Sequence, residues 1–262
     1  MPLRPIAELA PGSTADLVGI LCDIDDTLSW EGQLVPSAFA ALGAARDAGL
    51  RVVPITGRPA GWVDHLARMW PVDGVVGENG GLWFWVSKGR MERRFAQGDV
   101  ERRANRQRLV ALGTEILAAV PGAGLASDQP YRELDLAIDF CEDVLRLGDA
   151  EIDRIVALFE AGGATAKVSS IHVNGWFGGF DKLTGTRAFA RDRWGEDLDP
   201  TRWAYFGDSA NDEPMFAHFP LSVGVANVRH FLPRMKAWPE WVTEGSGGHG
   251  FAEGVKAILS AR

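Results

Sequence analysis

The sequence of 262 residues contains little cysteine and no long apolar segment. Its two cysteines, Cys22 and Cys141, each lie in an apolar run, and their number and spacing fit neither a disulfide framework nor a metal site. No stretch approaches the roughly 18 apolar residues of a membrane helix. The first residues also lack the apolar stretch of a signal peptide. We therefore predict a cytoplasmic protein that does not engage a membrane.

Basic residues are too few for a protein that binds nucleic acid. Lysine and arginine number 27 against 35 acidic residues, which gives a formal net charge of −8. Long polyanions bind to a basic face, so nucleic acid is not an expected partner. A small anion responds to the local field, so a small phosphorylated metabolite is compatible with this charge. The oligomeric state cannot be predicted from these features.

Short apolar runs alternate with helical segments near both ends of the chain. The predicted strands are 17–22, 50–55, 74–76, 82–86, 203–206 and 221–225. The predicted helices are 37–48, 61–70, 183–194 and 252–260, with a further helix beginning at 211. This alternation predicts an α/β fold with a doubly wound parallel sheet, formed by residues 1–86 and 178–262. The glycine-rich stretch 245–250 is expected to be a flexible loop.

The pattern changes in the middle of the chain. Helices are predicted at 101–120 and 150–161, and strands at 134–140 and 166–173. We expect residues 87–177 to form an inserted α+β domain.

Three carboxylates follow the first apolar run, in the sequence Asp23-Ile24-Asp25-Asp26-Thr27. Ligands bind beyond the carboxyl ends of the strands in a parallel sheet, so these acids are expected at a site. Crowded carboxylates repel one another, and a shared cation relieves the repulsion. Oxygen ligands in a phosphate-handling site suit Mg²⁺. The structural alternative is an acidic turn that caps a helix.

Thr56, Gly57 and Arg58 follow the second apolar run, just before Pro59. A hydroxyl group and free backbone N–H groups at a strand-to-helix turn can bind an anion. Arginine can add a bidentate contact to phosphate or carboxylate. A turn that needs glycine and proline would explain the same four residues, so this motif alone does not distinguish an anion site from a structural turn.

A second acidic segment, GDSAND at 207–212, follows the apolar run WAYF. Asp208 can join Asp23 around one metal ion. Asn211 and Asp212 lie at the next helix start, where they can cap the helix or orient groups around the metal. Lys182 precedes a helix that returns the chain to the core, which favours a functional role over a solvated surface lysine.

Together these residues resemble the phosphohydrolases of the haloacid dehalogenase (HAD) superfamily. The signature of that family is an Asp-x-Asp-x-Thr loop, a Thr or Ser, a Lys, and a Gly-Asp-x-x-Asn-Asp loop, in that order. These positions are filled by Asp23, Asp25, Thr27, Thr56, Lys182, Asp208 and Asp212. The insertion and the segments ENGG (78–81) and GVAN (224–227) are similar to the Cof-type cap branch, which includes sucrose-phosphate, trehalose-phosphate and mannosyl-phosphoglycerate phosphatases. Asp26 departs from the small residue usual at its position.

The resemblance implies catalytic roles for four residues. Asp23 would attack phosphorus and become an aspartyl phosphate. Asp25 would protonate the leaving alcohol and then take a proton from water. Thr56 and Lys182 would hold the phosphoryl oxygens. Mg²⁺ would be held by the Asp23 carboxylate, the Asp25 carbonyl and Asp208, with Asn211 and Asp212 beside it.

Substrate recognition is expected to fall partly to the inserted domain. His172 and Asn174 lie two apart in a strand pattern, so they share one face. The residues predicted to bind substrate are Thr27, Gly57, Arg58, Asn79, His172 and Asn174.

The sequence thus predicts a Mg²⁺-dependent phosphatase of a small phosphorylated metabolite, with a sugar phosphate favoured. One alternative is a phosphomutase of the same superfamily, which the residues do not separate from a hydrolase. Another is a non-enzymatic phospho-acceptor resembling a response-regulator receiver. The acid two positions after Asp23 and the inserted domain argue against the receiver.

Overall fold

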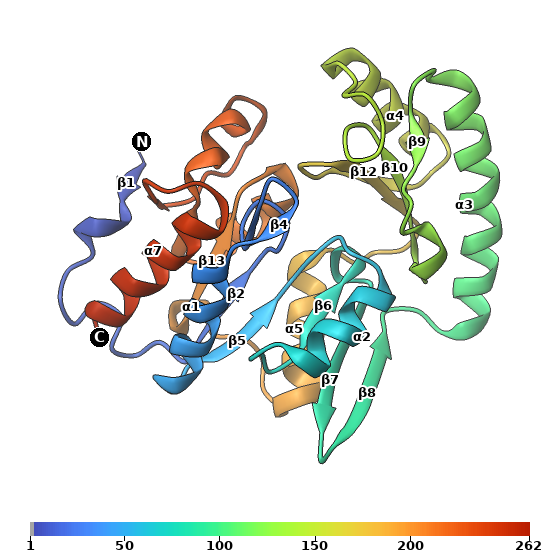
Figure 1. Ribbon diagram of the computed structural model, residues 1–262. Coiled ribbons are helices and arrows are strands. Elements are labelled where there is room, and N and C mark those ends of the chain that lie inside the picture. Colours follow the sequence, from blue (N-terminus) through green and yellow to red (C-terminus); the bar gives the residue numbers. More distant parts are fainter. Residues whose placement is uncertain (1–2) are drawn as a thin grey trace.

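The central feature of the computed structural model, which describes residues 3–262, is a six-stranded sheet in which all neighbouring strands are parallel (Figure 1). In spatial order its strands are β1 (Arg4–Pro5), β15 (Trp241–Val242), β14 (Leu221–Gly224), β13 (Trp203–Gly207), β2 (Gly19–Cys22) and β5 (Arg51–Pro54). The predicted α/β fold with a parallel-sheet core is confirmed.

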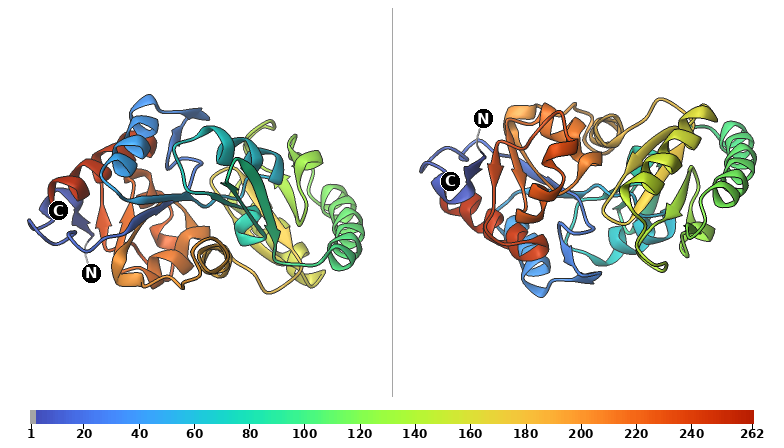
Figure 2. Two further views of the ribbon diagram at one scale, coloured as in Figure 1. Left: turned by 90° about the horizontal axis from the view of Figure 1, so that it is seen from below. Right: turned by 90° about the horizontal axis from the view of Figure 1, so that it is seen from above.

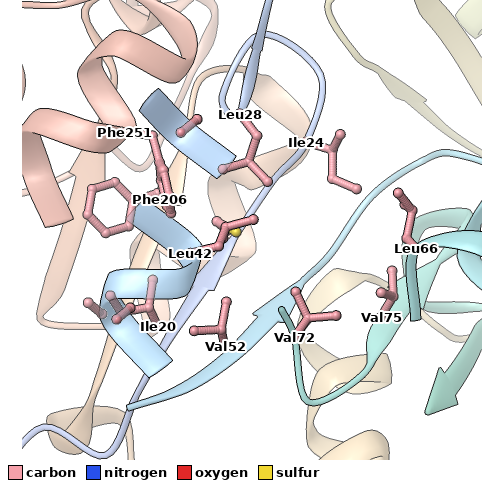
Figure 3. Packing of buried hydrophobic residues seen from close by; sticks show 14 of the residues in the cluster. Ile20, Ile24, Leu28, Leu42, Val52, Leu66, Val72, Val75, Phe206 and Phe251 are labelled. Carbon is pink, nitrogen blue, oxygen red and sulfur yellow. The ribbon is translucent and has the colours of Figure 1, made fainter. Parts of the chain in front are cut away.

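Both faces of this sheet are buried, because side chains alternate between two apolar clusters. On β2, Ile20 and Cys22 belong to one cluster and Leu21 to the other. The flanking helices are α1 (Pro36–Asp47) and α7 (Gly247–Ser260) on the first face, and α5 (Lys182–Trp194) and α6 (Glu213–His218) on the second. Figure 3 shows the first cluster, with Ile20 and Phe206 packed near Phe251 of α7 and Leu42 of α1. None of the helices in residues 3–262 combines the length and apolarity needed to cross a membrane.

A second, antiparallel sheet adjoins β5. It consists of β6 (Val75–Gly77), β7 (Leu82–Ser87) and β8 (Arg90–Phe95), and a parallel bridge between Ile55 and Val76 connects it to the main sheet. Helix α2 (Ala60–Met69) packs against it. Strand β8 was not predicted, because its sequence RMERRF is mostly charged and its residues are partly or largely exposed.

The middle of the chain forms a third sheet, of antiparallel strands, with its own apolar core. Its order is β11 (Thr165–Val168), β12 (His172–Trp176), β10 (Asp135–Asp139) and β9 (Gly124–Leu125). Helices α3 (Asp99–Ala119) and α4 (Asp149–Ala161) cover it through Leu109, Ile116 and Phe159. In Figures 1 and 2 this unit, which we call the cap, lies at the opposite end of the molecule from both termini. The boundaries 87 and 177 stay a prediction.

The strand expected at 166–173 is instead a hairpin of β11 and β12. Ser169 ends β11, because its hydroxyl accepts the backbone N–H of His172 at 3.0 Å and donates to the His172 carbonyl at 3.0 Å. Such side-chain-to-backbone bonds compete with the bonds of a sheet. His172 and Asn174 therefore both lie on β12 and are buried there.

The glycine-rich stretch 245–250 is not a free loop, since α7 begins at Gly247. A Cβ atom at Gly247 would lie 2.4 Å from the Ser29 carbonyl, and one at Gly248 would lie 2.3 Å from the Leu28 carbonyl. These glycines let the helix pack directly on backbone. The sequence suggested flexibility where close packing was the reason for glycine.

Candidate active site

The predicted motif residues lie together at the carboxyl ends of three neighbouring strands. Asp23 directly follows β2, Asp208 follows β13, and Thr56 lies two residues beyond β5. Strand β2 pairs with β13 on one side and β5 on the other. Parallel strands end at the same edge, so residues up to 185 positions apart in sequence meet there, as expected for a site in this type of sheet.

Three buried carboxylates form the centre of this site. Oxygen atoms of Asp23, Asp208 and Asp212 lie within 4.8 Å of one another. Burial raises the pKa of Asp23 to about 7, although Lys182 acts in the opposite direction. Burial, and then repulsion by Asp212 and Asp23, raises the pKa of Asp208 well above its usual value. Ionisation of all three carboxylates is therefore unfavourable in this buried cluster unless further positive charge is present.

Lys182 is the cation in contact with this cluster. Its Nζ donates to Asp23 Oδ1 at 2.9 Å and to Asp212 Oδ1 at 2.7 Å, and its side chain is buried. Burial lowers the pKa of Lys182, but the nearby Asp212 and Asp23 outweigh it and keep the pKa above its usual value. If all three carboxylates are ionised, the one ammonium group leaves two of their negative charges uncompensated.

The Asp212 carboxylate accepts four hydrogen bonds from the protein. Its Oδ1 accepts from Lys182 and from the Tyr205 hydroxyl, and its Oδ2 accepts the backbone N–H groups of Asp208 at 2.9 Å and Ser209 at 3.1 Å. These bonds hold the loop after β13 and fix the position of the lysine. Next to it, Asn211 accepts a bond from the Ser209 hydroxyl at 3.0 Å.

Asp208 is held from two sides. The Thr27 hydroxyl donates to its Oδ1 at 3.3 Å, so Thr27 lies against an acid of the cluster. Asn227 donates to Asp208 Oδ2 at 3.3 Å and to the Asp26 carbonyl at 3.0 Å. Asn227 was not among the predicted site residues, although the GVAN segment that contains it contributed to the resemblance.

Gly57, Asn79 and Asn174 lie close together on the other side of the site. A Cβ atom at Gly57 would lie 3.3 Å from Asn79 Nδ2 and 3.6 Å from Asn174 Oδ1. Asn79 adopts a left-handed backbone conformation with φ of 54° and donates its backbone N–H to the Thr56 carbonyl at 3.0 Å. Its side-chain Nδ2 is buried and has no hydrogen-bond partner among residues 3–262. A donor in this position is available to an oxygen atom of a ligand.

Arg58 points toward Asp25. Its Nε lies 3.0 Å from both Asp25 oxygens and its Nη2 lies 2.8 Å from Oδ1. The same Nη2 donates to Glu142 of the cap at 2.8 Å, and Nη1 lies 3.4 Å from Asp128. Glu142 in turn lies 2.9 Å from His172 Nε2. Arg58 and His172, both predicted to bind substrate, are thus linked through an acid that the sequence did not single out.

The neighbouring His172 lowers the pKa of Glu142 to about 2 against the opposing effect of burial, and Arg58 adds to the lowering. Burial lowers the pKa of Arg58, but Asp25 and then Glu142 outweigh it and raise the pKa above its usual value. Glu142 is therefore ionised at neutral pH.

Glu78 connects the core to the cap from a fully buried position. Its two carboxylate oxygens accept backbone N–H groups from Ala60, Glu133, Leu134 and Asp135, at 2.6 to 3.2 Å. Ala60 begins α2, whereas the other three residues lead into β10 of the cap. Burial, and then repulsion by Asp135, raises the pKa of Glu78 to about 8. Sequence analysis assigned no separate role to Glu78, because the groups that bind its carboxylate are backbone N–H groups.

Arg132 strengthens the same junction. It donates to the Gly57 carbonyl of the core at 2.7 Å and to Asp135 of the cap at 2.9 Å. It also contacts Asp128 at 3.0 Å, and Asp135 accepts a bond from Asn174 at 2.9 Å. Asn174 is therefore held in place by the junction between the two units.

Replacing Glu78 with glutamine is expected to lower the free energy of unfolding by about 2–4 kcal/mol. The amide would replace one acceptor oxygen and leave either the Ala60 N–H or those of Leu134 and Asp135 unpaired, at a cost of about 1–3 kcal/mol for each group. Urea denaturation measures this loss. Glu133→Gln is the matched control, because the Glu133 side chain is 45% exposed and its contact with Arg102 is 3.8 Å long. Equal stability of the two variants would contradict the assignment.

Comparison with known proteins first gives two curated relatives, each named phosphoglycolate phosphatase. The one from Methanoculleus marisnigri is 28% identical over 243 residues, which cover 90% of this chain and 94% of the relative. The one from Haloarcula marismortui is 28% identical over 244 residues, which cover 92% and 97%. No family model matches the chain.

Solved structures share the whole fold. A protein from Thermoplasma acidophilum has a TM-score of 0.71 at 19% identity, and covers 93% of this chain and 99% of its own. A phosphatase of the HAD superfamily from Bacteroides thetaiotaomicron has a TM-score of 0.62 at 20% identity, with 94% and 97% covered. The sucrose-phosphatase of Synechocystis, solved with sucrose and phosphate, has a TM-score of 0.63 at 15% identity, with 93% and 98% covered.

At these identities the solved structures establish the fold, and both curated relatives are named phosphatases. The same edge of the sheet carries the whole ordered set of motif residues. In fold the chain is similar to phosphatases of the HAD superfamily, and its two curated relatives are named as phosphatases.

Proposed function

We propose that the protein hydrolyses a small phosphomonoester with the help of Mg²⁺, through an aspartyl phosphate formed on Asp23. The observation that carries this proposal is the buried cluster of Asp23, Asp208 and Asp212 with Lys182. With all three carboxylates ionised, the two negative charges that Lys182 leaves uncompensated would match a divalent cation. A phosphate group would add further negative charge, so the cluster could accept one only with that cation present.

The residues available to a metal ion are Asp23 and Asp208. Asp212 is committed to four protein donors, so we assign it to orienting Lys182 and the loop. The predicted roles of the Asp25 carbonyl and Asn211 stay part of the proposal. Bound Mg²⁺ would supply positive charge that offsets the repulsion between the nucleophile and the phosphoryl oxygens.

The chemistry then requires two steps. An Asp23 oxygen forms a bond to phosphorus while the bond from phosphorus to the leaving oxygen breaks, and the leaving oxygen takes its electron pair and a proton from Asp25. In the second step Asp25 takes a proton from water as the water oxygen attacks phosphorus. The bond to Asp23 breaks, and inorganic phosphate and the free Asp23 carboxylate result.

Lys182 and the turn after β5 are the proposed phosphate-binding groups. Lys182 already lies 2.9 Å from Asp23, so its charge would face oxygens transferred to that carboxylate. Thr56 is buried at the end of the strand beside Gly57. The free Nδ2 of Asn79 adds a hydrogen-bond donor near Gly57. Preorganised donors of this kind stabilise charge that develops in the transition state.

The leaving group is proposed to be a hydroxylated one, as in a sugar phosphate. The guanidinium groups of Arg58 and Arg132 in the cap–core contact each face carboxylates, so neither is free to bind a substrate carboxylate. Phosphoglycolate, which carries such a carboxylate, is the second candidate because both curated relatives are named for it.

Release of inorganic phosphate from a panel of sugar phosphates, phosphoglycolate and nucleotides tests the function. Turnover is expected with Mg²⁺ and no bisphosphate activator, and is expected to stop in EDTA. No release from any compound would contradict hydrolysis, whereas strict dependence on a bisphosphate would indicate a phosphomutase. A higher kcat/KM for phosphoglycolate than for every sugar phosphate would select the second candidate.

A further inference from the structure

Arg58 is the point at which the cap contacts the proposed acid–base residue. It makes three contacts of 2.8 to 3.0 Å with the Asp25 carboxylate and one of 2.8 Å with Glu142. Its guanidinium carbon lies 4.5 Å from the centre of the Trp62 ring, and its backbone N–H donates to Thr56 at 3.0 Å. The planar group has fixed donor directions, so a change in its position would move the carboxylate bound to it.

Glu142 is held firmly on the cap side. It follows β10, and Asp139 accepts the backbone N–H groups of Cys141, Glu142 and Asp143 at 2.7 to 2.8 Å. His172 lies 2.9 Å from the second oxygen of Glu142. The loop bonds fix the backbone that carries this carboxylate, and His172 lies against its second oxygen.

We infer that Glu142 is a positioning residue, which sets the orientation of Asp25 through Arg58. Protonation of the leaving group then depends on the cap lying against the core, as it does in this structure. The inference rests on the proposed function, because it takes Asp25 as the acid. It predicts that a change in the cap alters a step performed entirely by core residues.

The test is the rate of aspartyl-phosphate formation, measured by rapid quench, for an alkyl and an aryl phosphate. Asp25→Asn gives the reference, with a loss of about 10²–10⁴-fold for the alkyl phosphate. Glu142→Ala is expected to lower the alkyl rate by about 10–100-fold, the scale expected for a misplaced catalytic group. p-Nitrophenyl phosphate needs little protonation, so its rate should fall by less than about threefold.

Two further variants separate positioning from damage to the fold. Glu142→Gln retains an oxygen that can accept from Arg58, so it should lose less than Glu142→Ala. Asp143→Ala removes a neighbouring charge of the same loop whose carboxylate makes no ion pair within residues 3–262, and it should leave both rates unchanged. In a protein that already carries Asp25→Asn, Glu142→Ala should lower the alkyl-phosphate rate by less than about twofold more. The effects of residues that act as a unit do not add.

Equal losses for both substrates, or a full additional loss in the Asp25→Asn background, would overturn the inference. A rise in KM at unchanged kcat would also overturn it, because Glu142 would then bind substrate directly. Failure of the proposed function looks different: the unchanged protein itself would form no aspartyl phosphate from the aryl substrate.

Discussion

Replacing Asp23 with asparagine is expected to abolish phosphate release, with a loss of about 10⁴-fold or more, as for other enzymes that lose their nucleophile. The amide is nearly the same size as the carboxylate, but it cannot form the acyl phosphate bond. It also loses the ionic attraction to the Lys182 ammonium group, which lies 2.9 Å from Asp23 Oδ1. Steady-state phosphate release with Mg²⁺ measures the loss, and acid quench should trap no phosphoenzyme.

Asp26→Asn is the matched control for this substitution. Asp26 lies in the same loop and has a left-handed backbone with φ of 54°, which asparagine tolerates well. Its carbonyl, which accepts the bond from Asn227, is retained. The control should keep full activity. A phosphoenzyme formed by Asp23→Asn would assign the nucleophile to another residue.

Replacing Asp208 with asparagine is expected to lower activity by about 10³-fold and, in EDTA, to raise the melting temperature. Lewis-acid stabilisation by a metal is worth several kcal/mol, which this loss reflects. The gain in stability follows from the raised pKa of Asp208, because burial and two neighbouring carboxylates make its charge unfavourable in the folded state. Asparagine retains an acceptor for Asn227, and the Thr27 hydroxyl can accept from its amide.

Thermal unfolding with and without Mg²⁺ measures both effects. At about 100 times its Kd, a ligand of the folded state adds about 2.7 kcal/mol. That corresponds to an increase of about 5–10 °C in the melting temperature of the unchanged protein, at roughly 2–4 °C per kcal/mol. Asp208→Asn should show no such increase. An equal increase in both proteins would place the cation elsewhere.

Much of the core could be predicted because its signals are local. A buried parallel strand is a short apolar run, so β2 and β13 were found within two residues of their ends. The acids that follow these runs lie at the site because parallel strands end at one edge. The order of Asp23, Thr56, Lys182 and Asp208 therefore predicted a convergence that the structure shows.

Elements whose residues are polar or small were harder to predict. Strand β8 lacks an apolar pattern, and the hairpin at Ser169 depends on one side chain that bonds to backbone. Gly247 and Gly248 have the composition of a loop but belong to α7, because another segment packs against their Cα atoms. In each case the contact that determines the secondary structure cannot be read from the pattern of apolar and polar residues within the segment.

The sequence by itself determined the fold class, the edge of the sheet that carries the site, and the chemical types gathered there. Only the tertiary structure decided which residues contact one another. Arg58, expected to contact phosphate or carboxylate, joins Asp25 to Glu142, which lies 84 residues beyond Arg58 in the chain. Glu78 connects α2 to the cap by accepting hydrogen bonds from backbone N–H groups, and these groups are the same whatever side chain a residue carries. Charge pairs and backbone contacts across such separations depend on how the cap lies on the core, and no periodic pattern within either segment encodes that arrangement.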